Sequence, residues 1–290
     1  MGADAEIYVF DYQRYRTEVV PALVALLRTG EPGPYLTSFF RETAAGHRMD
    51  FAARWPQIAA RLRMAPTDLA RHCTWLGPDL RHLPGPRTGA PRVEQRGALV
   101  CRSRFCPERV QCPMHQDRQA TELLNILYEA LVLARCLDRP QFVGRTFHPL
   151  VYGPVLDELA VPATDPVRAL LAALAGRGAV MGYVFGPTEG VHGWLTEAET
   201  ADLAHRLSAL PLPAFGADYA TMQHLHRLSL SRSAQARLAG RALTPADGPA
   251  WPALSLAFVR TVATIAAAEG RAVLWGNDLG YDQWIDYFLD

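Results

Sequence analysis

The sequence predicts a helix-rich α+β fold. Most apolar residues recur with the 3.6-residue period of amphipathic helices, while EIYVFDY (residues 6–12) and RAVLWGN (residues 271–277) have the pattern of strands. The chain has 290 residues, of which 49% are hydrophobic and 20% are charged, an ordinary composition for a globular protein. It is long enough to bury a sizeable core.

The N-terminal part begins with the strand over residues 6–12. The segment YRTEVVPALVALLRTG (residues 15–30) then has the helical period, with Pro21 in its first turns and a glycine at its end. We expect two more helices, over residues 51–63 and 66–76.

A change in composition suggests where the chain divides. Residues 77–92, GPDLRHLPGPRTGAPR, are dense in proline and glycine and poor in apolar side chains, which is typical of a linker or a long surface loop. We therefore expect an N-terminal α/β part over residues 1–76, a linker or loop over 77–97 and a C-terminal α+β part over 98–290. One continuous domain is the alternative.

Helices and strands alternate through the second half. An apolar stripe at helical spacing covers residues 117–136, with Asp117 as a suitable N-cap. Thr196 is a second expected N-cap, because an amphipathic helix follows it. The remaining expected elements are helices near residues 165–175, 196–209, 219–238 and 252–269, and a strand over residues 179–186.

The net charge and the lack of targeting or membrane-spanning patterns limit the functions that the sequence favours. The 29 basic and 29 acidic residues cancel, so no net field steers the chain toward nucleic acid or an anionic membrane. The first residues do not form a secretory signal, and no apolar run approaches the roughly 18 residues of a membrane span. We expect a cytoplasmic protein with no membrane partner.

The chain contains no lysine, since all 29 basic residues are arginine. P-loop enzymes and protein kinases need a lysine on the phosphates, and pyridoxal enzymes and Schiff-base aldolases need an amine nucleophile. These four classes are excluded.

The densest chemical feature is CRSRFCPERVQCPMH, residues 101–115. It contains Cys101, Cys106, Cys112 and His115, separated by four, five and two residues, in a chain with five cysteines. In a reducing compartment this clustering favours metal ligation over disulfides. Zinc takes three thiolates and an imidazole tetrahedrally, so we predict one zinc ion here. An iron–sulfur cluster and unligated thiols are the alternatives.

The predicted zinc is structural rather than catalytic. Four protein ligands close a tetrahedral site, whereas a catalytic zinc keeps one position for water. The helix that follows places its positive end beside Cys112 and His115, which favours the thiolate. Cys136 lies too far along that helix and is interpreted as a small buried apolar residue. Cys73, beside His72, stays open as a further ligand. The predicted fold is thus α+β with a zinc-stabilised loop.

The segment CRSRFCPERVQCPMH resembles the CCCH zinc fingers that bind RNA. Its middle gap of five residues matches that family, whereas its first gap of four and last gap of two are shorter. The resemblance implies RNA binding, with Phe105 stacking on a base and neighbouring arginines on phosphates. Residues 81–118 contain eight arginines and three acidic residues, which a solvated loop also explains.

A second resemblance covers the last hundred residues. GWLTEAETADLAHRL and AAEGRAVLWGNDLGYDQW are similar to a pattern in uncharacterised proteins of high-GC bacteria, some of which are similar to immunity or accessory proteins. The resemblance implies a binding role and brings no catalytic motif. The C-terminal segment NDLGYDQWIDYFLD adds an acidic stripe opposite an apolar face, either a solvated surface or a contact for a basic partner: Asp278, Asp282, Asp286 and Asp290.

We therefore expect a zinc-binding protein that acts through a specific protein partner, in an immunity, accessory or regulatory role. The first alternative is a zinc-dependent enzyme acting on a small molecule, which a deep pocket lined by His192, His224 or the zinc would favour; His224 and His226 are otherwise interpreted as ordinary core or surface histidines. The second is RNA binding through the arginine-rich loop. No catalytic residue is assigned.

Overall fold

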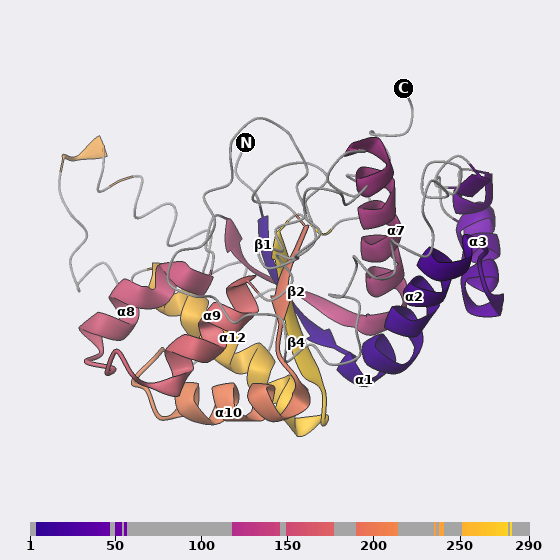
Figure 1. The fold of residues 1–290 in the computed structure, drawn as a ribbon. Coiled ribbons are helices and arrows are strands. Elements are labelled where there is room, and N and C mark those ends of the chain that lie inside the picture. The colour runs from indigo at the N-terminus through magenta and orange to yellow at the C-terminus, as the bar shows by residue number, and fades with distance from the viewer. Residues whose placement is uncertain are drawn as a thin grey trace. The chain divides into compact units, whose positions relative to one another are not determined.

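The computed structural model describes residues 4–46, 50–53, 55–56, 118–145, 149–176, 190–213, 235, 238–240, 251–277 and 279. It confirms a helix-rich α+β chain (Figure 1). The chain forms two compact units. Unit 1 comprises Met1–Phe10, Asp138–Ala175 and His192–Asn277, and unit 2 comprises Asp11–Leu137, Gly176–Val191 and Asp278–Asp290. The predicted boundaries near residues 76 and 97 lie outside the described residues and stay predictions.

A four-stranded sheet in the order β2-β1-β4-β3 lies mainly in unit 1. Strands β1 and β4 pair antiparallel, with Ile7 opposite Trp275 and Val9 opposite Val273. Two of these strands, β1 and β4, were predicted from sequence and are confirmed to within about two residues at each end. The four strands are β1 (Asp4–Phe10), β2 (Leu137–Arg145), β3 (Gly190–Trp194) and β4 (Ala272–Asn277).

Strands β2 and β3 were not predicted, because Pro140 in β2 and Gly193 in β3 are residues that local patterns associate with loops. In the fold, each of these residues fits its strand. Pro140 in β2 cannot donate a ladder hydrogen bond, and β2 lies at an edge of the sheet, where proline is tolerated. Gly193 in β3 lies against α9 (Pro166–Gly176), where an added Cβ would be 2.4 Å from the Ala173 carbonyl oxygen. The glycines that flank His192 in EGVHGWLT predict a loop from the local pattern, and this prediction is wrong: His192 lies in β3, where Gly193 permits close packing.

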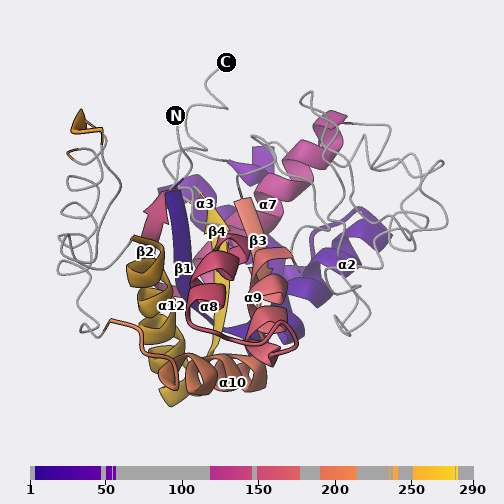
Figure 2. The same ribbon diagram turned by 90° about the vertical axis from the view of Figure 1, so that its left-hand side faces the viewer.

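Four helices lie on one face of the sheet within unit 1 (Figures 1 and 2). Helix α12 packs against β1 and β4, and α10 packs against α12 and β4. The predicted helices near residues 165–175, 196–209 and 252–269 are confirmed. The four are α8 (Gly153–Glu158), α9, α10 (Glu197–Ser208) and α12 (Trp251–Ala268), with a short 3₁₀ helix, η4 (Pro149–Tyr152), before α8.

Helix α10 begins with the predicted N-cap. The Thr196 Oγ1 accepts a hydrogen bond from the Glu199 amide at 3.2 Å, and the Glu199 carboxylate accepts one from the Thr196 amide at 2.9 Å. This reciprocal pair satisfies two donors that a helix start leaves without intrahelical partners.

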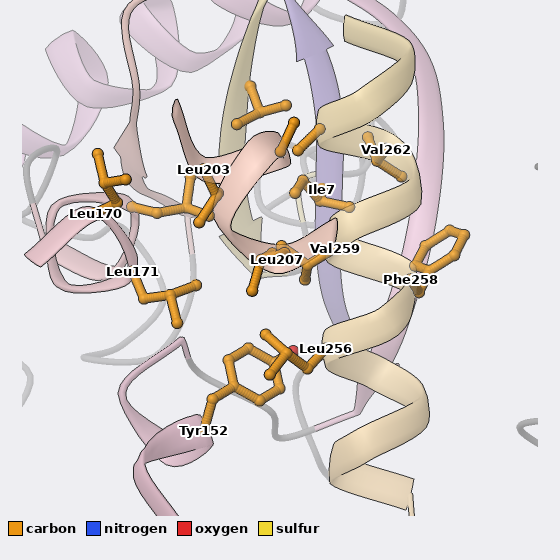
Figure 3. Packing of buried hydrophobic residues seen from close by; sticks show 14 of the residues in the cluster. Ile7, Tyr152, Leu170, Leu171, Leu203, Leu207, Leu256, Phe258, Val259 and Val262 are labelled. Atoms are coloured by element: carbon orange, nitrogen blue, oxygen red, sulfur yellow. The ribbon is translucent and has the colours of Figure 1, made fainter. Parts of the chain in front are cut away.

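The core of unit 1 is aliphatic. Ile7 on β1 faces Val259 and Val262 on α12, while Leu203 and Leu207 of α10 project into the same space (Figure 3). Three hydroxyls at this core form hydrogen bonds: those of Tyr152 and Ser255 lie 2.7 Å apart, and Thr200 Oγ1 accepts from the Val273 amide at 3.2 Å.

Unit 2 contains helices α1 (Tyr12–Arg14), α2 (Val20–Thr29), α3 (Pro34–Gly46) and α7 (Arg118–Cys136), with a π-helical turn, η1 (Tyr15–Val19), between α1 and α2. The predicted helix over residues 15–30 is confirmed, and it ends where Gly30 adopts φ 75°. The helix over residues 117–136 is confirmed as α7. Helix α3 was not predicted.

None of the helices in the described ranges is long and apolar enough to cross a membrane. The helix expected over residues 66–76, that near 219–238 and the strand over 179–186 fall on residues that the structure does not describe, apart from residues 235 and 238.

Candidate functional site

The predicted zinc ligands lie outside the described residues, so the zinc site stays a prediction. The other sequence candidates outside the described residues are His72, Cys73, His224, His226, Asp278, Asp282, Asp286 and Asp290. Among the described residues, no group of three or more His, Cys, Asp or Glu side chains is placed to hold a metal.

Helix α7 bounds the predicted zinc segment on its C-terminal side. It begins at Arg118, three residues after His115, and ends at Cys136. Its 19 residues span about 27 Å at roughly 1.5 Å per residue. Cys136 is a free, buried cysteine with 1% of its surface exposed, which confirms its interpretation as a small buried residue.

His192 is a buried histidine of strand β3, with 4% of its surface exposed. Its ring meets the indole of Trp275 edge to face, with the ring centroids 4.8 Å apart. Such an aromatic contact stabilises a packed core.

Polar side chains gather instead where the end of α7 meets α3, in unit 2. We define the Arg135 cluster as Arg135 of α7 with Tyr35, Phe39 and Glu42 of α3. The Arg135 guanidinium carbon lies 6.0 Å from the Tyr35 ring centroid and 5.7 Å from that of Phe39, within the range of cation–π attraction. One guanidinium nitrogen, Nη2, lies 2.5 Å from Glu42 Oε2.

Glu42 is the acceptor of the Arg135 cluster, but it does not accept from every donor there. Ser38 Oγ donates to Glu42 Oε1 at 3.2 Å, so both carboxylate oxygens have partners. Within the described part of the chain, the buried Nε of Arg135 and the buried hydroxyl of Tyr35 have no hydrogen-bond partner. Two donors of the Arg135 cluster are thus buried without an acceptor, a costly arrangement for polar groups.

The electrostatics keep the Tyr35 hydroxyl in its donating form. Burial, together with the nearby Cys136 and Glu18, raises the pKa of Tyr35 to about 12, so the hydroxyl keeps its proton at neutral pH. The hydrogen bond from Arg135 holds the pKa of Glu42 below its usual value. Arg14 Nη1 donates to the Arg135 carbonyl at 3.1 Å and fixes the end of α7 from the side of α1.

A second polar group lies deeper in unit 2. The hydroxyls of Tyr15 and Tyr128 are 3.3 Å apart and both rings are buried. Burial raises the pKa of both tyrosines. The buried carboxylate of Glu129 accepts a hydrogen bond from the Val191 amide at 3.3 Å.

Sequence reasoning missed the Arg135 cluster because helix α3 was not predicted. Tyr35, Phe39 and Glu42 are spaced by four and three residues, which is the spacing of one helix face. This spacing could have indicated a helix at α3. No local pattern, however, predicts that Glu42 contacts Arg135, which lies 93 positions further along the chain. Comparison of the chain with protein-family models, curated proteins and solved structures returns no match.

Proposed function

We propose that this chain is a cytoplasmic zinc-binding protein that acts by contact with a protein partner. The observation that carries the proposal is the set Cys101, Cys106, Cys112 and His115, four zinc-type donors within fifteen residues. The zinc is structural, since four protein ligands leave no position for a reacting water.

The confirmed start of α7 supports this proposal. The helix begins three residues after His115, so its unpaired amides and positive end favour negative sulfur nearby. Leu127, Tyr128 and Leu131 of α7 are buried, which makes the helix a fixed support for the segment before it. Zinc binding contributes on the order of 10 kcal/mol in small zinc modules, enough to order a segment with little core of its own.

Metal analysis of the purified full-length chain tests the zinc. We expect one equivalent in the wild type, substantial loss in Cys106→Ala, and retention in the matched control Cys136→Ala, whose cysteine lies at the far end of α7. Absence of zinc in the wild type, or undiminished zinc in Cys106→Ala, rejects the assignment. Stoichiometric iron would instead favour the iron–sulfur alternative.

Chelation tests the structural role. Because zinc binds only the folded state in this account, its removal should lower the melting temperature by several degrees or more. Unchanged melting together with loss of an activity would favour the zinc-dependent enzyme, in which a water replaces His115 and is activated as a nucleophile. A His115→Ala variant that keeps its zinc would point the same way.

The partner role rests on what the chain carries. It has no lysine for Schiff-base or P-loop chemistry, and the acidic stripe predicted from its C-terminal sequence suits a basic protein surface. Affinity purification from the native host should recover a stoichiometric protein partner with the wild type and lose it with Cys106→Ala. RNA binding that persists at moderate salt would favour the RNA alternative, because purely phosphate-directed binding weakens steeply with salt.

A further inference from the structure

We propose that Arg135 and Tyr35 form a binding site for a small oxyanion, a carboxylate or a phosphate group. This site goes beyond the proposed function: it lies at the C-terminal end of α7, in the described part of unit 2, and needs no metal. Its basis is the pair of buried donors, Arg135 Nε and the Tyr35 hydroxyl, that have no acceptor among the described residues.

The geometry of the Arg135 guanidinium shows which kind of acceptor would fit its Nε. Nε and Nη2 of an arginine lie on one edge and donate in parallel, which matches the two oxygens of a carboxylate or two oxygens of a phosphate. Glu42 Oε2 accepts from the Nη2 of Arg135 and its Oε1 accepts from Ser38, whereas the Nε of Arg135 has no acceptor among the described residues. An incoming oxyanion that takes this edge satisfies Nε and displaces Glu42.

Tyr35 completes the donor set. It comes from the same helix as Glu42, and its ring already lies against the Arg135 guanidinium. Its high pKa keeps the hydroxyl protonated, so it donates to an anion and does not repel it. Phe39 covers the guanidinium at 5.7 Å and lowers local access of water, which strengthens a charge-assisted hydrogen bond.

Glu42 acts as the internal competitor. Its side chain is about half exposed, with 51% of its surface accessible, so it can move into solvent at little cost. A ligand must outcompete this carboxylate, and removing the competitor should strengthen binding. That expectation separates a ligand site from two donors that merely stabilise the helix packing.

Calorimetric titration of the full-length protein with sodium phosphate and, separately, sodium acetate at constant ionic strength tests the site. We expect saturable binding of at least one anion, and the arm that binds identifies the oxyanion. Tyr35→Phe should weaken binding roughly tenfold, because it removes one hydrogen bond to a charged group. Glu42→Gln should strengthen binding by several-fold. The control Arg41→Gln removes an exposed positive charge from the same helix and should leave binding within about twofold of wild type.

Two results would overturn the proposal. One is the absence of saturable binding by both anions in the wild type and in Glu42→Gln. The other is binding that Tyr35→Phe leaves unchanged, or that Arg41→Gln weakens as much as Tyr35→Phe does. Neither result bears on the zinc, which metal analysis measures independently. Tyr35→Phe and Glu42→Gln both leave Arg135 in place, so the test does not depend on an Arg135 variant that folds.

Discussion

The buried hydroxyls of unit 1 and the Arg135 cluster of unit 2 differ in their hydrogen bonding. In the core of unit 1, the hydroxyls of Tyr152 and Ser255 pair with each other, and Thr200 accepts from a strand amide. In the Arg135 cluster of unit 2, two buried donors lack acceptors among the described residues. Burying a donor without a partner costs stability, and an oxyanion bound at the Arg135 cluster would supply the missing acceptor.

We expect the core of unit 1 to contribute mainly to stability and the Arg135 cluster of unit 2 to contribute to binding. The mainly aliphatic core of unit 1 stabilises the sheet and its helices, and its buried hydroxyls add hydrogen bonds between these elements. Unit 2 contains the described polar cluster, and the predicted zinc segment lies within its residue range. Substitutions in unit 1 should therefore change stability, whereas those in the Arg135 cluster should change binding.

The largest expected effect is in the unit 1 core. Leu207→Ala removes a buried side chain that packs between α10 and α12 (Figure 3) and should cost about 2–5 kcal/mol of unfolding free energy. The matched control is Leu238→Ala, because Leu238 is 88% exposed; its cost should stay within about 0.5 kcal/mol. Chemical denaturation measures both, and equal costs would show that the core is not the source of stability in unit 1.

A smaller loss is expected where β3 meets α9. Gly193→Ala would place a Cβ 2.4 Å from the Ala173 carbonyl oxygen and 2.5 Å from that of Leu174, and these are backbone atoms that cannot rotate away. We expect a loss of about 1–3 kcal/mol. Gly153→Ala, with nothing within 4 Å of its Cβ, should be neutral or stabilising by under about 1 kcal/mol. A harmless Gly193→Ala would contradict the described packing.

Alkaline pH tests the buried tyrosines of unit 2. Burial raises the pKa of Tyr15 and Tyr128 above the unfolded value of 10.0. The unfolded state therefore loses protons first, so their contribution is present below about pH 10 and is lost as pH rises further. The free energy of unfolding should fall by about 1.4 kcal/mol per pH unit for each such group.

In Tyr15→Phe, the free energy of unfolding should fall less steeply with pH, by the contribution of one titrating group, about 1.4 kcal/mol per pH unit. The variant also loses the hydrogen bond to Tyr128, which lowers its stability at every pH. Urea denaturation at several pH values between about 9 and 12 measures the slope. A slope that is the same in wild type and Tyr15→Phe would mean that Tyr15 ionises alike in both states.

Local patterns were enough to predict much of the fold. The periodic segments that became α7, α10 and α12 were found because an amphipathic helix shows its period in the sequence, and Thr196 shows its cap. Strands β2 and β3 were missed because Pro140 and Gly193 indicate loops locally, whereas an edge position and a close helix contact explain them in the fold.

The zinc site and the Arg135 cluster also differ in how far local sequence predicts them. The zinc ligands lie within fifteen residues, so composition and spacing alone predict them. The Arg135 cluster depends on a contact between Glu42 and Arg135 across 93 positions, which only tertiary structure provides. It also depends on unpaired donors, and no sequence pattern reports whether a buried donor has an acceptor.

Zinc X-ray absorption spectroscopy of the purified chain identifies the atoms bound to the metal. We expect three sulfur ligands at about 2.3 Å and one nitrogen at about 2.0–2.1 Å, with the nitrogen lost or replaced in His115→Ala. Cys136→Ala should leave the spectrum unchanged. A site with fewer than three sulfurs, or with a water oxygen in place of the imidazole in the wild type, would contradict a closed structural zinc held by Cys101, Cys106, Cys112 and His115.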